Sequence, residues 1–197
     1  AAAAMQLDFL AVSFPRSAAD IENARRLLHE AGGSGLIVAK IERAEAVEDL
    51  ENIVEASDVI MIARGDLGVE MGFSSVPGIQ KRILAMTRKR NKLSITATQM
   101  MESMITHPLP TRAEVSDVAN AVLEGADALM LSGETAMGSH PKLVIETMTK
   151  IILEVEAKAY YYNRDEMLRP QAHSPSLLSD AICYNACKLA EDVNAEA

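Results

Sequence analysis

Two acidic residues and a lysine stand near the ends of two short apolar stretches, and their spacing suits a metal site. Glu42 ends the stretch LIVAKIE (36–42), and Asp66 ends the stretch DVIMIARGD (58–66). Lys40 precedes Glu42 by two residues, so on a strand both side chains project to the same side. Two carboxylates at a shared edge repel each other unless a cation lies between them, and Mg²⁺ prefers one or two carboxylates with water and substrate oxygens. The pattern therefore predicts a divalent-cation site, with a pair of solvated surface acids as the simpler alternative.

Lys40 is a cation within an otherwise apolar run, and a buried ammonium group must be paired. The simpler interpretation is a salt bridge to Glu42 or Asp66. The functional interpretation is a cation that faces negative charge as it develops on a reacting oxygen or a transferring phosphoryl group. The sequence alone leaves both interpretations open.

Gly65 and Thr98 could add contacts to a ligand at the same edge. Gly65 has no side chain, so a ligand could approach the backbone N–H groups there, although a glycine also simply allows the chain to turn. Thr98 follows the next apolar stretch and offers a hydroxyl that can donate to a carboxylate. Threonine is common in strands, so its presence alone does not indicate a site.

The candidate residues all lie at the ends of short apolar stretches that alternate with helical patterns. The stretches predicted as strands are residues 8–14, 36–42, 58–66, 93–99 and 127–134. The patterns predicted as helices are residues 20–31, 43–56, 76–90, 112–123 and a longer one from Pro141 towards Tyr160. Strand–helix units in series imply parallel strands, and nearly continuous apolar strands imply a sheet covered on both faces.

A doubly wound sheet and a (β/α)₈ barrel both agree with this alternation. Polar residues end each apolar stretch, as they do at the rim of a barrel, where several strands contribute to one site. No glycine-rich phosphate-binding fingerprint follows a strand, which argues against a Rossmann site. The predicted fold is α/β, an incomplete (β/α)₈ TIM barrel with about five of the eight units that closure requires.

The pattern changes after the predicted barrel segment, which covers residues 1–160. Residues 161–176 are polar and include two prolines, so they are predicted to be a linker, and residues 177–197 are predicted to be the first helix of a second α/β domain. Cys183 and Cys187 lie one helical turn apart in this last segment. We expect two buried thiols in a reducing compartment, and half of a metal site is the weaker alternative.

The composition narrows the classes of function. The chain has 197 residues, of which 49% are hydrophobic and 24% charged, and this is ordinary for a globular protein. Its net charge of −9 argues against a nucleic acid partner. No run approaches the roughly 18 apolar residues of a membrane span, and Ala1–Ala4 lacks the features of a signal peptide. We therefore expect a cytoplasmic protein without a membrane or nucleic acid partner.

Long ordered runs of this sequence resemble the pyruvate kinase family. The matching runs are SFPRS (13–17), AKIERAEAVEDLENI (39–53), IMIARGDLGVE (60–70), ITATQMMESMI (95–105), PTRAEVSDVANAV (110–122) and LMLSGETAMG (129–138). They cover roughly residues 8–155 in the family's order and spacing. The stretch VEMGFSSVPGIQK (69–81) departs from the more widespread form, in which a proline follows the GDLGVE run, and is similar to a bacterial subgroup.

The resemblance implies phosphoryl transfer from phosphoenolpyruvate to ADP, which gives pyruvate and ATP in the last step of glycolysis. Carried over by motif, Glu42 and Asp66 would ligate Mg²⁺ or Mn²⁺, and Lys40 would be catalytic and stabilise the transferring phosphoryl group. Gly65 and Thr98 would bind the substrate together with Lys40 and Asp66. A K⁺ site is possible outside this chain, and relatives in this family are usually homotetramers when complete.

Because three barrel strands are missing, the chain is expected to be part of a longer protein and to be inactive alone. One alternative is another Mg²⁺-dependent barrel enzyme that acts on pyruvate or phosphoenolpyruvate, such as an aldolase. Such an enzyme would not be expected to match ITATQMMESM (95–104) or PTRAEVSDVANA (110–121). A second alternative is a non-catalytic scaffold fragment.

Overall fold

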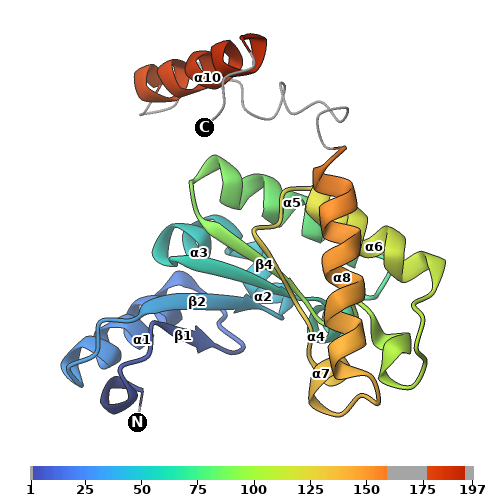
Figure 1. Cartoon of the computed structure of the whole chain (residues 1–197). Helices are drawn as coiled ribbons and strands as arrows, with labels where there is room; N and C mark the ends of the chain where they lie inside the picture. Colours follow the sequence, from blue (N-terminus) through green and yellow to red (C-terminus); the bar gives the residue numbers. More distant parts are fainter. Residues whose placement is uncertain (1, 159–176, 194–197) are drawn as a thin grey trace. The chain divides into compact units, whose positions relative to one another are not determined.

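The computed structural model describes residues 2–158 and 177–193, which fall into two compact units, Ala1–Val155 and Glu156–Ala197. The first unit contains one sheet of five parallel strands, which are hydrogen-bonded in chain order (Figure 1). The strands are β1 (Phe9–Val12), β2 (Leu36–Ile41), β3 (Val59–Ala63), β4 (Leu93–Ala97) and β5 (Ala128–Met130). The five predicted strands and their parallel arrangement are confirmed.

One or more helices follow each strand, as expected for repeated strand–helix units. In the first unit they are α1 (Ala18–Glu30), α2 (Ala44–Glu48), α3 (Leu50–Ala56), α4 (Arg64–Met71), α5 (Val76–Lys89), α6 (Arg112–Leu123), α7 (Gly133–Ala136) and α8 (Pro141–Glu156), with the 3₁₀ turns η1 (Ala3–Met5) and η2 (Glu102–Ile105). The second unit contains α10 (Leu177–Asp192).

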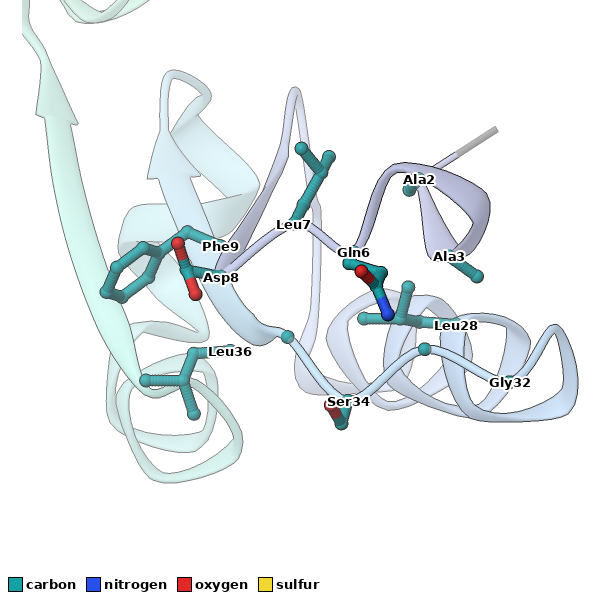
Figure 2. Close-up of a pocket in the computed structure, with 12 residues that line it drawn as sticks. Ala2, Ala3, Gln6, Leu7, Asp8, Phe9, Leu28, Gly32, Ser34 and Leu36 are labelled. Carbon is teal, nitrogen blue, oxygen red and sulfur yellow. The ribbon is translucent and has the colours of Figure 1, made fainter.

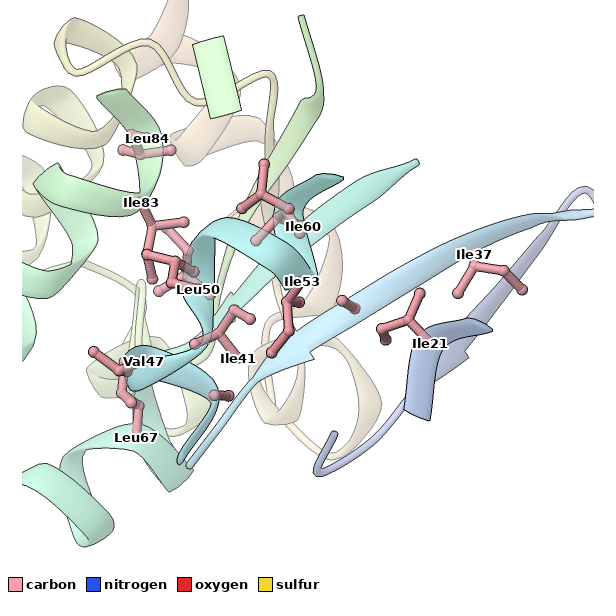
Figure 3. Close-up of a cluster of buried hydrophobic side chains, with 14 of the residues drawn as sticks. Ile21, Ile37, Ile41, Val47, Leu50, Ile53, Ile60, Leu67, Ile83 and Leu84 are labelled. Carbon is pink, nitrogen blue, oxygen red and sulfur yellow. The ribbon is translucent and has the colours of Figure 1, made fainter. Parts of the chain in front are cut away.

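One face of the sheet packs against the apolar sides of the helices. Ile37 and Ile41 of β2 and Ile60 of β3 meet Leu50 and Ile53 of α3 in a fully buried cluster, and Figure 3 shows these side chains converging from sheet and helices. Ile37 and Ile41 are four positions apart, and Ile60 pairs with Ala39 midway between them, so all three point to the same face. Burial of this apolar surface is the main source of stability for the unit.

The opposite face of the sheet carries a smaller cluster that contains only strand residues. Val38, Val59, Met61 and Ala97 pack together there, with no helix residue among the cluster's members. A face lined only by strand side chains is what the interior of a parallel barrel presents. Lys40 lies two residues after Val38 and therefore projects to this same face.

Aspartates brace the amino ends of two strands. Asp58 precedes β3, and its Oδ2 accepts hydrogen bonds from Ile37 N at 2.7 Å and from Arg25 Nη1 at 2.8 Å. Asp127 precedes β5 in the same way, and its Oδ2 accepts from Ser94 N at 2.8 Å. Burial alone would raise the pKa of Asp58, but the hydrogen bonds from Ile37 and Arg25 outweigh it and lower that pKa.

Two predicted elements differ from the structure for local reasons. The single helix expected over residues 43–56 is interrupted at Asp49, whose carboxylate accepts hydrogen bonds from Ala18 N at 3.0 Å and Asn52 Nδ2 at 2.6 Å. The strand expected over residues 58–66 ends at Ala63, because α4 begins at Arg64. Asp66 therefore lies in the first turn of a helix that directly follows a strand.

The two cysteines lie on α10, as expected, but both are exposed, so the prediction of buried thiols is wrong for the described structure. The predicted linker, residues 161–176, lies within a range outside the described residues. Among the described residues, no helix is long and apolar enough to cross a membrane.

We expect Asp58→Asn to lower the free energy of unfolding by about 1–3 kcal/mol at pH 7, because a carboxylate that accepts two hydrogen bonds is lost. The folded-state pKa lies below the unfolded value of about 3.9, so the contribution is complete above that pH and is lost as the pH falls through the folded-state pKa. Urea unfolding at several pH values measures the difference.

Asp8→Asn is the matched control for this prediction. Asp8 precedes β1 as Asp58 precedes β3, but its exposed carboxylate has no hydrogen bond with any residue in the described ranges. Its replacement should leave the unfolding free energy unchanged. Equal effects of the two substitutions would contradict the bracing role of Asp58.

Candidate functional site

Lys40 and Glu42 form an ion pair at the carboxyl end of β2. Lys40 Nζ lies 2.6 Å from Glu42 Oε1, and the Glu42 side chain is completely buried while that of Lys40 is 24% exposed. The predicted arrangement on one side of the strand is confirmed, since the two side chains are in contact. A buried carboxylate needs such a partner because removal from water penalises its charged form.

Residues 13 and 14, which follow β1, hold this ion pair in place. Ser13 Oγ accepts a hydrogen bond from Lys40 Nζ at 2.9 Å, and Phe14 N donates to Glu42 Oε2 at 2.6 Å. The ring of Phe14 lies 6.0 Å from Lys40 Nζ, within reach of a cation–π contact. No local pattern indicated these contacts, because the partners are 27 and 28 residues apart in the chain.

Glu42 Oε1 has the properties of a metal ligand. It is buried, and its contact with Lys40 Nζ is an ion pair whose angles are unsuitable for a hydrogen bond. It accepts no hydrogen bond from any residue that the structure describes. Oε2 accepts a hydrogen bond from Phe14 N, so the carboxylate is oriented with Oε1 towards the ammonium group of Lys40, and a cation at Oε1 would share it with Lys40. Hard divalent cations bind such oxygens, so Glu42 fits the predicted role.

Asp66 lies at the same edge of the sheet, after the neighbouring strand. Ile41 of β2 pairs with Ile62 of β3, so the two strands end at the same level. The Asp66 side chain is exposed, and it forms no hydrogen bond or ion pair with any described residue. Its carboxylate oxygens are therefore open to an ion or ligand.

Within the described residues, no group of three or more histidine, cysteine, aspartate or glutamate side chains is placed to hold a metal ion. A site built on Glu42 and Asp66 would therefore need other oxygens to complete its coordination. Mg²⁺ commonly binds one or two carboxylates and fills the remaining positions with water and substrate oxygens. The residues present fit that mode of binding better than a cage made only of protein ligands.

Thr98 and Gly65 are joined directly. Gly65 N donates to Thr98 Oγ1 at 2.8 Å, and the same hydroxyl lies 2.6 Å from the carbonyl oxygen of Ala97, to which it donates. The hydroxyl of Thr98 is thus satisfied within the chain. A ligand carboxylate could receive this hydrogen bond only if the hydroxyl turned away from Ala97.

Arg64 is a site residue that the sequence analysis missed. It begins α4 and is 8% exposed, and its guanidinium donates to the carbonyl oxygens of Thr98 and Gln99 and pairs with Asp117. A charged residue in the apolar run VIMIARGD was the available signal, because a buried charge needs partners. The same argument was applied to Lys40.

A buried glutamate anchors the segment that follows β4. Glu134, at the start of α7, is 2% exposed and accepts hydrogen bonds from Met101 N at 3.2 Å and Ser132 N at 2.8 Å. Met100 and Met101, which follow β4, are completely buried. The carboxyl ends of β4 and β5 are thereby tied together.

Glu114, near the start of α6, holds the same segment from its other end. Its carboxylate accepts from Ser103 N at 2.7 Å and Ser103 Oγ at 2.6 Å, and also from Thr111 N at 2.7 Å. Burial alone would raise the pKa of Glu114, but the hydrogen bonds from Ser103 and Thr111 outweigh it and lower that pKa. Glu114 therefore remains a carboxylate at neutral pH.

A hollow in the first unit lies away from these residues. Figure 2 shows a cavity of about 540 Å³ whose lining includes Leu7, Leu28 and Leu36. The lining residues precede β1 and β2 or begin them, so the cavity lies at the amino ends of these strands. It is at the opposite end of β2 from Glu42 and contains none of the predicted site residues.

Comparison with known proteins decides the family. The family described as "Pyruvate kinase, barrel domain" matches residues 1–145 of this chain. This chain belongs to the pyruvate kinase family. The resemblance found in the sequence and the predicted partial barrel are both confirmed by this match and by the parallel sheet.

Curated pyruvate kinases agree with the assignment. "Pyruvate kinase" from Buchnera aphidicola subsp. Schizaphis graminum is 60% identical over 153 residues, which are 76% of this chain and 32% of that protein. "Pyruvate kinase II" from Salmonella typhimurium is 56% identical over 158 residues, which are 79% of this chain and 33% of that protein.

A further relative matches nearly the whole of this chain. "Pyruvate kinase" from Mycobacterium intracellulare is 46% identical over 191 residues, which are 97% of this chain and 39% of that protein. The chain therefore spans about a third of the length of the curated pyruvate kinases that it matches.

We expect Glu42→Gln and Asp66→Asn each to weaken Mn²⁺ binding to this chain by about 10–100-fold, because each removes an anionic ligand. Lys40→Met should not weaken it, since the ammonium group competes with the ion for Glu42 Oε1. Electron paramagnetic resonance titration of free Mn²⁺ measures both effects.

Glu45→Gln is the control for this titration, because Glu45 pairs with Arg43 and is 44% exposed. It should leave Mn²⁺ binding unchanged. Equal affinities for the parent chain and the Glu42 variant would exclude Glu42 as a ligand.

Proposed function

We propose that this chain supplies part of the catalytic centre of a pyruvate kinase, which transfers a phosphoryl group from phosphoenolpyruvate to ADP and yields pyruvate and ATP. The observation that carries the proposal is the buried Glu42, whose carboxylate is ion-paired with Lys40 at the carboxyl end of β2. The family match adds to it, although this chain covers only about a third of each curated relative.

Lys40 is the proposed catalytic residue. Phosphoryl transfer depends on positioning and charge neutralisation more than on covalent chemistry by the protein. The ammonium group is held by Ser13 and Glu42, and it would face negative charge on the transferring phosphoryl group and on the oxygen that it leaves. Such a fixed cation acts mainly on the transition state, where that charge is largest.

Glu42 and Asp66 are the proposed ligands of a Mg²⁺ or Mn²⁺ ion. When bound, such an ion supplies positive charge that binds substrate oxygens and offsets the charge that develops on them. Phe14 N fixes the orientation of Glu42, and Asp66 stays open to solvent. A K⁺ requirement would involve a site outside this chain.

Gly65 and Thr98 are the proposed contacts of the substrate's carboxylate. Their mutual hydrogen bond places a backbone N–H and a hydroxyl side by side. Both groups are donors that suit a carboxylate, and the Gly65 N–H would have to leave Thr98 Oγ1 to contact it. On binding, the Thr98 hydroxyl would exchange its bond to Ala97 for one to the substrate.

The remaining features of the complete protein are part of the same proposal. We propose that residues 1–160 are barrel, residues 161–176 a linker, and residues 177–197, which include α10, the first helix of a C-terminal domain. The complete protein would be a cytoplasmic homotetramer. The present chain alone would be inactive, because five strands do not close a barrel.

A chimera tests the proposed activity. The matching segment of this chain would replace its counterpart in pyruvate kinase II from Salmonella typhimurium, so that activity depends on Lys40, Glu42 and Asp66 of this sequence. We expect pyruvate formation that requires phosphoenolpyruvate and ADP. Lys40→Met in the chimera should lower kcat by about 10²–10³-fold and change KM for phosphoenolpyruvate by no more than about threefold.

Lys81→Met is the control in the chimera, because Lys81 is a largely exposed residue of α5. It should retain the activity of the parent chimera. A folded chimera without phosphoryl transfer would favour the scaffold alternative, and aldol cleavage in its place would favour the aldolase alternative. Unchanged turnover in the Lys40 variant would remove Lys40 from the mechanism.

A further inference from the structure

Two consecutive residues after β4 adopt an unusual backbone conformation. Thr98 has φ 68° and Gln99 has φ 53°, so both lie in the left-handed region. Residues other than glycine are uncommon there, and threonine is especially so because it branches at Cβ. Such a conformation persists only where surrounding contacts hold it, and it often marks a functional site.

The guanidinium of Arg64 supplies these contacts. Arg64 Nη2 donates to Thr98 O at 2.8 Å and to Gln99 O at 3.1 Å, and Arg64 Nε donates to Thr98 O at 3.2 Å. Three N–H groups of one rigid fork thus hold two successive carbonyl groups. Lysine could not reproduce this arrangement, because its ammonium is a single point with no fixed plane.

The guanidinium is itself held from the opposite side. Arg64 Nη1 lies 2.8 Å from Asp117 Oδ1 of α6 and 3.5 Å from Gln80 Oε1 of α5. Gln80 Nε2 in turn donates to Glu124 Oε2 at 2.9 Å. Because the Arg64 side chain is only 9% exposed, these contacts fix its position and compensate its charge.

The next residue along the chain completes the link. Gly65 N donates to Thr98 Oγ1 at 2.8 Å, so residues 64–65 and 98–99 are joined by donors from both Arg64 and Gly65. The segments that directly follow β3 and β4 are therefore held together by these hydrogen bonds. Any change in the turn at Thr98 would move the hydroxyl and release the Gly65 amide.

We propose that Arg64 is a positioning residue that holds the Thr98 hydroxyl, which accepts from the Gly65 amide, where it can turn from Ala97 to donate to a carboxylate ligand. It acts through the backbone of Thr98 and Gln99 and does not itself touch the substrate. The inference rests on the proposed function for its link to a ligand. The local effect of Arg64 on the two edges can be measured without any ligand.

Amide hydrogen exchange in the chain tests this local effect. The Gly65 amide depends on Arg64 through Thr98, and the Ile37 amide depends on Arg25 in a parallel way, through Asp58 at the other end of the strands. Arg64→Met should raise the exchange rate at Gly65 by about tenfold relative to that at Ile37. The matched control, Arg25→Met, should have the reverse effect.

The ratio of the two rates separates a local effect from general destabilisation, which would raise both rates together. Arg64→Lys serves as a milder variant, and we expect an intermediate ratio because lysine lacks the planar fork. An unchanged ratio in both Arg64 variants would overturn the proposal.

Binding of oxalate to the Mn²⁺-loaded chain tests the link to a ligand, with oxalate as a dicarboxylate probe. Arg64→Met should weaken oxalate binding by about tenfold or more while Mn²⁺ affinity stays within about twofold, and Arg25→Met should change neither. Faster exchange at Gly65 with unchanged oxalate affinity would overturn the positioning role. If the parent chain does not bind oxalate, the proposal that this chain alone binds a carboxylate ligand is wrong. The ratio of exchange rates at Gly65 and Ile37 still tests whether Arg64 holds the segments after β3 and β4 together.

Discussion

The burial of one carboxylate, that of Glu42, is the constraint on which the site depends. A charge removed from water must be compensated nearby, and the available partners are the ammonium of Lys40 and the amide of Phe14. The ion pair therefore keeps the end of β2 neutral while leaving one oxygen without a hydrogen bond from the described residues. An incoming cation would share Glu42 with Lys40, so both positive charges would be held close to the same reacting group. The chemistry proposed for this edge follows from that forced proximity.

Local patterns in the sequence were enough to predict most of the fold. The helix expected over residues 112–123 is α6, and that expected over 76–90 ends one residue earlier, because apolar periodicity, a capping glutamate and flanking prolines are all local signals. The alternation of strands with helices is likewise visible in local patterns, and it was enough to predict the parallel sheet. The short α4 was missed because its eight residues include two glycines and directly follow a strand.

The candidate site was predicted only where its contacts are local. Lys40 and Glu42 are two residues apart, so the period of a strand places them together. Arg64 and Thr98 are 34 residues apart, and their contact depends on which strands become neighbours and at what register. The left-handed backbone at Thr98 and Gln99 contains no glycine, which would have indicated it in the sequence, so only the structure shows it. Sequence reasoning named the candidate chemical groups, but it could not name the residues that hold them.

The amino ends of the strands carry residues that stabilise the sheet, and the carboxyl ends carry the candidate site. At the amino ends, Asp58 and Asp127 bind backbone amides of the preceding strands, whereas the carboxyl ends carry the ion-paired carboxylate of Glu42 and the exposed carboxylate of Asp66. Substitutions at distant sites without shared partners combine additively, so changes at one end need not disturb the other. A protein engineer could therefore raise the thermal stability of this fold through substitutions near Asp58 and Asp127, without changing the residues at the carboxyl ends of the strands.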